Sequence, residues 1–281
     1  MGFHWPPKVI YIVSEALFDL SAKVIQLRRA TSRAAEQGAD SALFLHQQVA
    51  EDIAERLQVF RKKFNNTTIF RDVDFDWTEA LALKTGQGVI QVLPAPLAVQ
   101  DFPLEPQSQD LIIAPLWLHW VNDLPQMLLA LRFALKPGGL LIGAMFGGES
   151  LIELKRCLAE AEDRLSGGVH PRTSPSVDLR TLAGLMQSAG FSVPVADGDR
   201  IPLQYANALK LLKDLSDAGE ANALQARSRA PMSRGLMLET ARLYHERFAD
   251  PETGLVPVTC DVLHFSGSAP EAVTASRSVV E

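Results

Sequence analysis

The chain has 281 residues, 47% of them hydrophobic, so it can bury a full core as one α/β domain with a helical extension. Its 27 Lys and Arg residues against 33 Asp and Glu residues give a formal charge of -6, which disfavours a phosphate-binding surface, so nucleic acid is not an expected partner. The two cysteines, Cys157 and Cys260, are far apart and provide neither a disulfide framework nor a zinc site, which suits a reducing compartment.

The start of the chain predicts no targeting or membrane segment. The apolar residues 9–13 lack a basic leader and are followed by Glu15 and Asp19. No run approaches the roughly 20 apolar residues that a spanning helix needs. We therefore expect a cytoplasmic protein without a transmembrane segment.

Two amphipathic helices are predicted before the first strand. The first covers residues 17–35, and its basic residues are typical of a solvated face. These basic residues are Lys23, Arg28, Arg29 and Arg33. Ser41 is a good N-cap for the second helix, whose apolar residues recur at helical spacing between residues 45 and 60. We assign residues 1–65 to an N-terminal helical extension.

Short strands and helices then alternate along the chain. Strands are predicted at 67–70, 89–93, 110–115, 140–146, 191–196 and 257–265, and helices at 76–85, 125–135, 151–165, 179–188, 207–215 and 236–248. This alternation predicts a mostly parallel sheet with helices on both faces. Residues 66–267 form this domain, and the small, polar residues 268–281 form a predicted disordered tail.

Three loops follow predicted strands at the edge where such sheets bind ligands, which is outside the carboxyl ends of the strands. They come after Phe70, at residues 119–123 and at residues 146–149. His119 is either a base or substrate contact, or a structural histidine that bonds the loop backbone. Trp120 is either a partner contact or a packing anchor for the next helix.

The polar residues of these loops have two readings as well. Asn122 and Asp123 either take part in chemistry or cap the helix that begins near Pro125. Glu149 is either a substrate contact or a favourable charge at a helix N-terminus. The other histidines have no metal-ligand spacing, so we expect no metal site.

Three segments resemble a known family. They are Leu-His-Trp-Val-Asn-Asp-Leu-Pro at 118–125, Leu-Lys-Pro-Gly-Gly at 135–139 and Ile-Gly-Ala-Met-Phe-Gly-Gly-Glu at 142–149. Together they resemble class I methyltransferase-like proteins related to the mitochondrial assembly factor of respiratory complex I and its bacterial counterparts. Shorter likenesses at 17–19, 49–57, 190–191, 214–222 and 256–259 extend the resemblance over nearly the whole chain.

The resemblance implies a Rossmann-like class I methyltransferase fold and S-adenosylmethionine as cofactor. It also implies methylation or arginine hydroxylation of a protein side chain, with a respiratory complex I subunit as partner. The candidate site residues are, for catalysis, His119, Asn122 and Asp123; for the cofactor, Asp101 and Leu116; and for a substrate or partner, Trp120, Phe146 and Glu149.

The sequence departs from the family where the cofactor would bind. Relatives carry a glycine-rich turn after the first strand, because glycine lets backbone N–H groups approach the cofactor. Here residues 71–77 contain three aspartates and no glycine. Residues 93–95, Leu-Pro-Ala, replace the acid that should end the second strand and hold the ribose. The region between residues 67 and 102 is also short, so an element of the fold is expected to be missing.

The free energies of the missing hydrogen bonds predict that cofactor affinity is lost. Three or four hydrogen bonds to a charged group, at about 1.5–3 kcal/mol each, amount to roughly 5–10 kcal/mol. A micromolar ligand has only about 8 kcal/mol of binding free energy. We therefore predict a protein-binding assembly factor with an eroded cofactor site and little or no catalysis. The alternative is an active S-adenosylmethionine-dependent methyltransferase, or an arginine hydroxylase using that cofactor, acting on a protein side chain.

Overall fold

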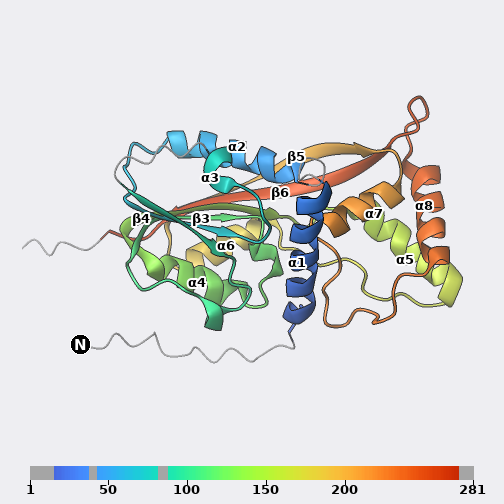
Figure 1. The fold of residues 1–281 in the computed structure, drawn as a ribbon, viewed down its shortest axis with the longest axis horizontal. Helices are drawn as coiled ribbons and strands as arrows, with labels where there is room; N and C mark the ends of the chain where they lie inside the picture. The colour runs from blue at the N-terminus through green and yellow to red at the C-terminus, as the bar shows by residue number, and fades with distance from the viewer. Residues whose placement is uncertain (1–15, 38–42, 82–87, 272–281) are drawn as a thin grey trace, which may run out of the picture.

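The computed structural model describes residues 16–37, 43–81 and 88–271, and in them a six-stranded sheet is covered by helices (Figure 1). The strands are β1 (Asn66–Arg71), β2 (Val89–Pro94), β3 (Gln109–Pro115), β4 (Leu135–Phe146), β5 (Ser192–Tyr205) and β6 (Val256–Ser268). They follow the order β2-β1-β3-β4-β6-β5. The first four are parallel, and β6 is antiparallel to both of its neighbours.

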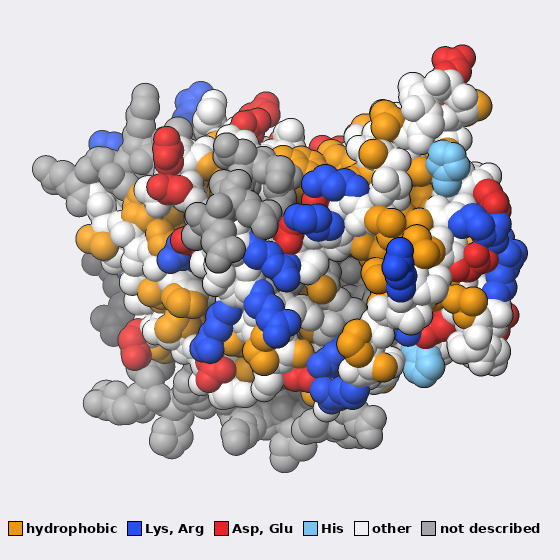
Figure 2. Space-filling model, turned by 45° about the vertical axis from the view of Figure 1, so that its right-hand side comes forward, with side chains coloured by type: hydrophobic (Ala, Val, Ile, Leu, Met, Phe, Trp, Pro, Cys, Tyr) orange, Lys and Arg blue, Asp and Glu red, His pale blue; other side chains and the backbone are white. Residues whose placement is uncertain are grey.

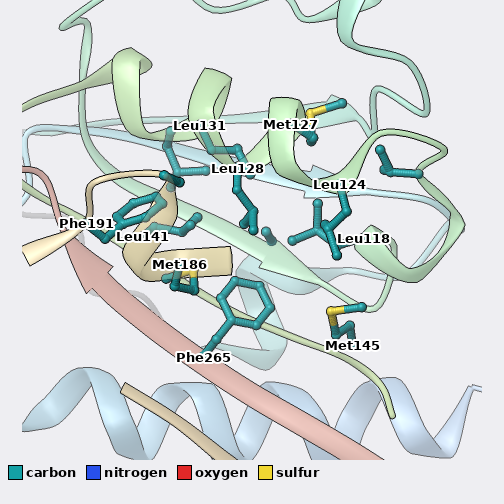
Figure 3. Close-up of a cluster of buried hydrophobic side chains, with 14 of the residues drawn as sticks. Leu118, Leu124, Met127, Leu128, Leu131, Leu141, Met145, Met186, Phe191 and Phe265 are labelled. Carbon is teal, nitrogen blue, oxygen red and sulfur yellow. The ribbon is translucent and has the colours of Figure 1, made fainter. Parts of the chain in front are cut away.

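Helices cover both faces of this sheet, as predicted. One face carries α4 (Leu124–Ala134) and α6 (Leu179–Ser188), whose Leu128 and Met186 pack with Phe265 of β6 (Figure 3). The other face carries α2 (Phe44–Gln58) and the single turn α3 (Trp77–Ala80). Because β3 and β4 are buried from both sides, they are the continuous apolar runs that the sequence shows.

A second helical layer lies beyond the central sheet. It consists of α5 (Ile152–Ser166), α7 (Ala208–Asp217) and α8 (Arg234–Phe248). These helices pack on the outer ends of β5 and β6, where the hydroxyl of Tyr244 donates to the carbonyl of Pro257 at 2.8 Å. The strands β5 and β6 are therefore much longer than predicted, because they serve two cores.

The α1 helix (Leu20–Gln37) lies across the carboxyl ends of the strands (Figure 1). Phe18, just before it, forms a β-bridge with Leu224, and the N–H of Asp19 donates to the carbonyl of Ala223 at 2.8 Å. The start of the described chain is thus fixed to a segment some two hundred residues later.

The connection between β2 and β3 is short. Residues 95–108 contain only the 3-10 helix η1 (Val99–Asp101), and β2 is the edge strand of the described sheet. The turn at Lys136-Pro137-Gly138-Gly139 lies inside β4, and Gly138 has the positive φ, +70°, that the turn requires.

Several predicted boundaries were wrong or lie outside the described residues. The helix predicted at 151–165 begins one residue later, because Leu151 is the N-cap residue of α5 with a left-handed backbone, and Ser150 bonds to Asp261. Ser41 and the end of the helix predicted at 76–85 fall outside the described residues. Ser268 belongs to β6 and Ala269 is buried, so the first residues of the predicted tail are ordered, while 272–281 lie outside the described residues.

Candidate functional site

A cluster of buried charges lies at the carboxyl ends of β1 and β3, where the strand order reverses and sheets of this kind bind ligands. Its centre is Glu220. One of its carboxylate oxygens accepts from Lys23 Nζ at 3.1 Å and the other from His119 Nε2 at 3.1 Å, while Trp120 Nε1 donates to both at 3.0 and 3.1 Å. Lys23 is fully buried, donates also to the carbonyl of Gly219 at 2.8 Å, and lies 3.8 Å from the centre of the Trp120 ring.

The charged groups of the cluster stabilise one another electrostatically and so oppose the effect of burial. Desolvation works against ionisation of Glu220, but the charges of Lys23 and His119 and their hydrogen bonds outweigh it and keep the pKa of this carboxyl well below its usual range. Desolvation also lowers the pKa of Lys23, and the carboxylates of Glu220 and Asp72 oppose that shift. Nearby, burial lowers the pKa of His46 to about 4, so this imidazole is neutral at pH 7.

The interpretation of His119 as a histidine that bonds the loop backbone was wrong, because its Nε2 bonds to Glu220. It lies in the 3-10 helix η2 (Leu118–Trp120) directly after β3, and its ring packs edge-on against Phe146 with 4.9 Å between ring centres. Glu220 therefore fixes the orientation of the imidazole, as carboxylates do in acid-base sites.

Trp120 and Asn122 hold the start of the chain in place. Trp120 packs edge-on against Phe18 at 5.1 Å and so anchors the segment before α1, not the following helix. The side-chain oxygen of Asn122 accepts from the N–H of Phe18 at 2.7 Å, and its amide donates to the carbonyl of Phe18 at 3.1 Å. Asp123 caps α4 by accepting from the N–H of Gln126 at 3.1 Å, which confirms the capping reading for this residue alone.

The remaining candidates lie apart. Glu149 is exposed and ion-paired with Arg200. Asp101 is exposed at the end of η1. Leu116 is buried in the core beneath α2, with a φ of +51° and its N–H bonded to the carbonyl of Ala144 at 2.7 Å. The structure thus brings His119, Trp120 and Phe146 together and separates them from these three residues.

Lys23 and Glu220 are the functional residues that sequence reasoning missed. The basic side of α1 was taken as a solvated face, which holds for the exposed Arg28 and Arg29 but is wrong for Lys23. A signal was present, because Lys23 shares a helical face with Leu27 and Ala30, which lie four and seven residues on.

In the first crossover of the fold, between β1 and α3, several N–H groups are already bonded within the segment. The carboxylate of Asp76 accepts from the N–H groups of Thr78 and Glu79, both at 3.0 Å. The N–H of Val73 donates to the Asp72 side chain at 2.9 Å, and the N–H of Phe75 donates to the carbonyl of Val73 at 3.0 Å. The four-residue α3 therefore presents its first N–H groups to its own cap and not to a ligand.

The crossover differs from the glycine-rich turn that the family resemblance implies for S-adenosylmethionine. The amino-acid carboxylate of this cofactor needs unpaired N–H donors and close backbone approach. Instead the segment presents side chains, with Val73 and Trp77 buried and Asp72 half-buried beside Lys23.

A cavity of about 430 Å³ opens beside the buried cluster. His119, Trp120, Phe146 and Glu220 line one part of it, and residues of α5, α7, α8, β5 and β6 and of the loop 172–176 line much of the rest. Within the described residues, no group of three His, Cys, Asp or Glu side chains is arranged to hold a metal ion. No helix among them is long and apolar enough to cross a membrane.

The fold is that of a class I methyltransferase-fold protein. Residues 73–143 match the methyltransferase domain family model. A solved structure, that of a candidate methyltransferase from Bacillus halodurans C-125, aligns with 78% of this chain and 99% of its own length, with a TM-score of 0.51. At 11% identity, that likeness shows the fold alone.

The chain is homologous to the mitochondrial arginine-hydroxylase NDUFAF5 and to bacterial methyltransferases. It is 38% identical to the Mus musculus NDUFAF5 over 172 residues, covering 61% of this chain and 50% of the relative. It is 32% identical over 179 residues to the malonyl-[acyl-carrier protein] O-methyltransferase of Xylella fastidiosa (strain M23), covering 63% and 58%. The chain thus spans about half the length of the NDUFAF5 relative it matches.

Proposed function

We propose that this protein is a methyltransferase-fold assembly factor that binds a protein partner and has lost the cofactor site of its relatives. The observation that carries the proposal is the first crossover, where Asp72 and Asp76 take up backbone N–H groups that a bound S-adenosylmethionine would need. These bonds would have to break before a cofactor carboxylate could form its own, so the gain of about 1.5–3 kcal/mol per bond is offset.

The buried cluster adds an electrostatic reason. A ligand at the carboxyl ends of β1 and β3 would lie next to the Lys23 ammonium, which is already over the Trp120 ring. The sulfonium of S-adenosylmethionine is also a cation, and because Lys23 already pairs with Glu220, the cluster offers this second cation no free carboxylate. The cluster therefore supports a structural role for this end of the sheet.

The proposed recognition surface comprises the exposed residues Asn122, Asp123 and Glu149 together with the exposed side of α1, including Arg28 and Arg29. Figure 2 shows Lys and Arg side chains gathered over the middle of one face of the molecule. By its homology to NDUFAF5, the proposed partner is a subunit of respiratory complex I. The cytoplasmic location and the domain division at residues 65 and 267 remain predictions.

Calorimetric titration of the full chain with S-adenosylmethionine and with S-adenosylhomocysteine tests the loss of the cofactor site. We expect no heat of binding, while the Xylella relative, titrated under the same conditions, serves as the positive control. A thermal shift assay gives an independent measure, because ligand at a hundred times its Kd adds about 2.7 kcal/mol to the unfolding free energy. Low-micromolar binding of either compound would overturn the proposal.

Affinity capture tests the partner. The tagged chain, returned to a strain that lacks it, should retain a complex I subunit, and the double variant Arg28→Glu, Arg29→Glu should retain less. In the same deletion strain, mass spectrometry of respiratory subunits distinguishes the two roles. A methyl or hydroxyl group that disappears with the gene would establish catalysis and contradict the proposal.

A further inference from the structure

The cavity beside the buried cluster extends away from the candidate residues His119, Trp120 and Phe146 at one end, and its chemistry is mainly apolar. Its wall is built largely of aliphatic and aromatic side chains from α5, α7, α8, β5 and β6. These include Leu154, Leu158, Leu203, Leu211, Leu212, Leu215, Met237 and Val258. A volume of about 430 Å³ falls in the range of small-molecule sites, which is roughly 300–1,000 Å³.

One cation in the wall of this cavity has no ion-pair partner in the described part of the chain. Lys155 of α5 is half-buried and lines both this cavity and a second hollow of about 600 Å³ next to it. Its ammonium makes one long hydrogen bond, 3.4 Å to the carbonyl of Gly148, and has no carboxylate partner among the described residues. Burial lowers its pKa, as expected for an ammonium that has lost water and gained no counter-ion.

The carboxylates around the cavity already have hydrogen-bond partners, and two of them are ion-paired. Glu162 accepts from Arg172, the cavity's other cation, and from His170. Glu220 accepts from Lys23, as described above, and Glu153 accepts from the hydroxyl and N–H of Thr259. The cavity therefore has an apolar interior, and among the described residues Lys155 is a cation in its wall without an ion-pair partner.

We propose that this cavity binds a carboxylate-bearing amphiphile of the medium-chain fatty-acid type, with its carboxylate on Lys155 and its aliphatic chain among the leucines of α5 and α7. A cationic ligand is disfavoured, because Glu220 is occupied by Lys23. An uncharged apolar ligand leaves Lys155 half-buried and unpaired, whereas a carboxylate forms the charge-assisted hydrogen bond that this ammonium lacks. The hydroxyls of Thr173 and Ser174 line both hollows with Lys155.

Calorimetry with the full chain and dodecanoate tests the proposal, with dodecanol as the uncharged probe. We expect dodecanoate to bind the wild-type chain at least ten times more tightly than dodecanol. Lys155→Met should weaken dodecanoate binding by about ten- to a hundred-fold and leave dodecanol binding unchanged. Lys155→Arg, which keeps the charge, should retain most of the affinity, and Leu212→Trp, which fills the cavity, should weaken both probes.

Lys210→Met is the matched control, because Lys210 is an exposed lysine of α7 that pairs with Asp214 and does not line the cavity. Thermal melts of each variant establish that it is folded. The proposal fails if dodecanoate does not bind, if dodecanol binds equally well, or if folded Lys155→Met binds dodecanoate as the wild type does. These outcomes are independent of the titration with S-adenosylmethionine, so each proposal stands or falls separately.

Discussion

Replacing Lys23 with methionine should destabilise the protein strongly, although the two side chains have similar length. The change removes the ammonium that donates to Gly219 and Glu220 and leaves the Glu220 carboxylate buried with only His119 and Trp120 as partners. Removing one partner of a buried ion pair costs about 3–5 kcal/mol, because the other charge stays in a poorly solvating environment. For a chain of this size, each kcal/mol lowers the Tm by about 2–4 °C, so we expect a loss of roughly 6–20 °C.

Urea unfolding of Lys23→Met, Glu220→Gln and the double variant measures how far the two residues depend on each other. Each single variant should lose stability, and the double variant should lose less than the sum of both, with a coupling of about 1–3 kcal/mol. Arg28→Met on the exposed side of the same helix is the control and should change stability by less than about 0.5 kcal/mol. Strict additivity, or a Lys23→Met cost no larger than that of the control, would refute the assignment of a coupled buried pair.

Three further predictions concern other parts of the fold. Desolvation raises the pKa of Asp72 to about 7, so ionisation of this carboxyl lowers the free energy of unfolding as pH rises through 7. Asp72→Asn should therefore be more stable than the wild type at pH 8. In urea titrations this gain should shrink toward pH 5. The hydrogen bond from Arg172 lowers the pKa of Glu162 to about 2, so the ionised carboxylate stabilises the fold at neutral pH, and this stabilisation is lost as pH falls toward 2. Glu162→Gln should lower the free energy of unfolding by about 1.5–3 kcal/mol at pH 7 and by little in acid. A loss that does not depend on pH would contradict this. A methyl group at Gly143 would overlap the β3 backbone, so Gly143→Ala should lower the free energy of unfolding by about 1–3 kcal/mol in thermal melts. Gly148→Ala is the control, because the added methyl group has room there, and it should lower this free energy by less than about 0.5 kcal/mol. Equal losses would show that β4 adjusts freely.

The central sheet and its helices could be predicted because their signals are local. The α6 helix has the predicted bounds, since Asp178 caps its first turn and Gly190, with a φ of +80°, follows its end. The buried strands β3 and β4 are continuous apolar runs that end at proline or glycine signals. The short connection after β2 was predictable as well, because few residues separate β1 from β3.

The outer half of β5 could not be predicted in this way. Residues 197–202 contain two aspartates, a glycine, an arginine and a proline, which disfavour a strand in isolation. Pairing with β6 imposes the extended backbone there, from Asp197 opposite His264 to Tyr205 opposite Val256. Strand length was set by a partner some sixty residues away, which no local pattern records.

The candidate site was predictable only in part. The loop after β3 follows from the strand order, so His119 and Trp120 were found by their place in the chain. Their shared partner, Glu220, lies a hundred residues further on and carries no motif that marks it as buried. Lysine is also rarely buried, so its residue type argued against Lys23 despite its helical face.

The bond between Lys23 and Glu220 spans 197 positions, and this separation constrains how the protein is made. At about 5–20 residues per second, a ribosome needs roughly 10–40 s after synthesising Lys23 before it adds Glu220. Throughout that interval Lys23 lacks the carboxylate that binds it directly, and Trp120 lacks the acceptor of its N–H. The buried cluster at the carboxyl ends of β1 and β3 can therefore form only late in synthesis, after the strands that it covers have been made.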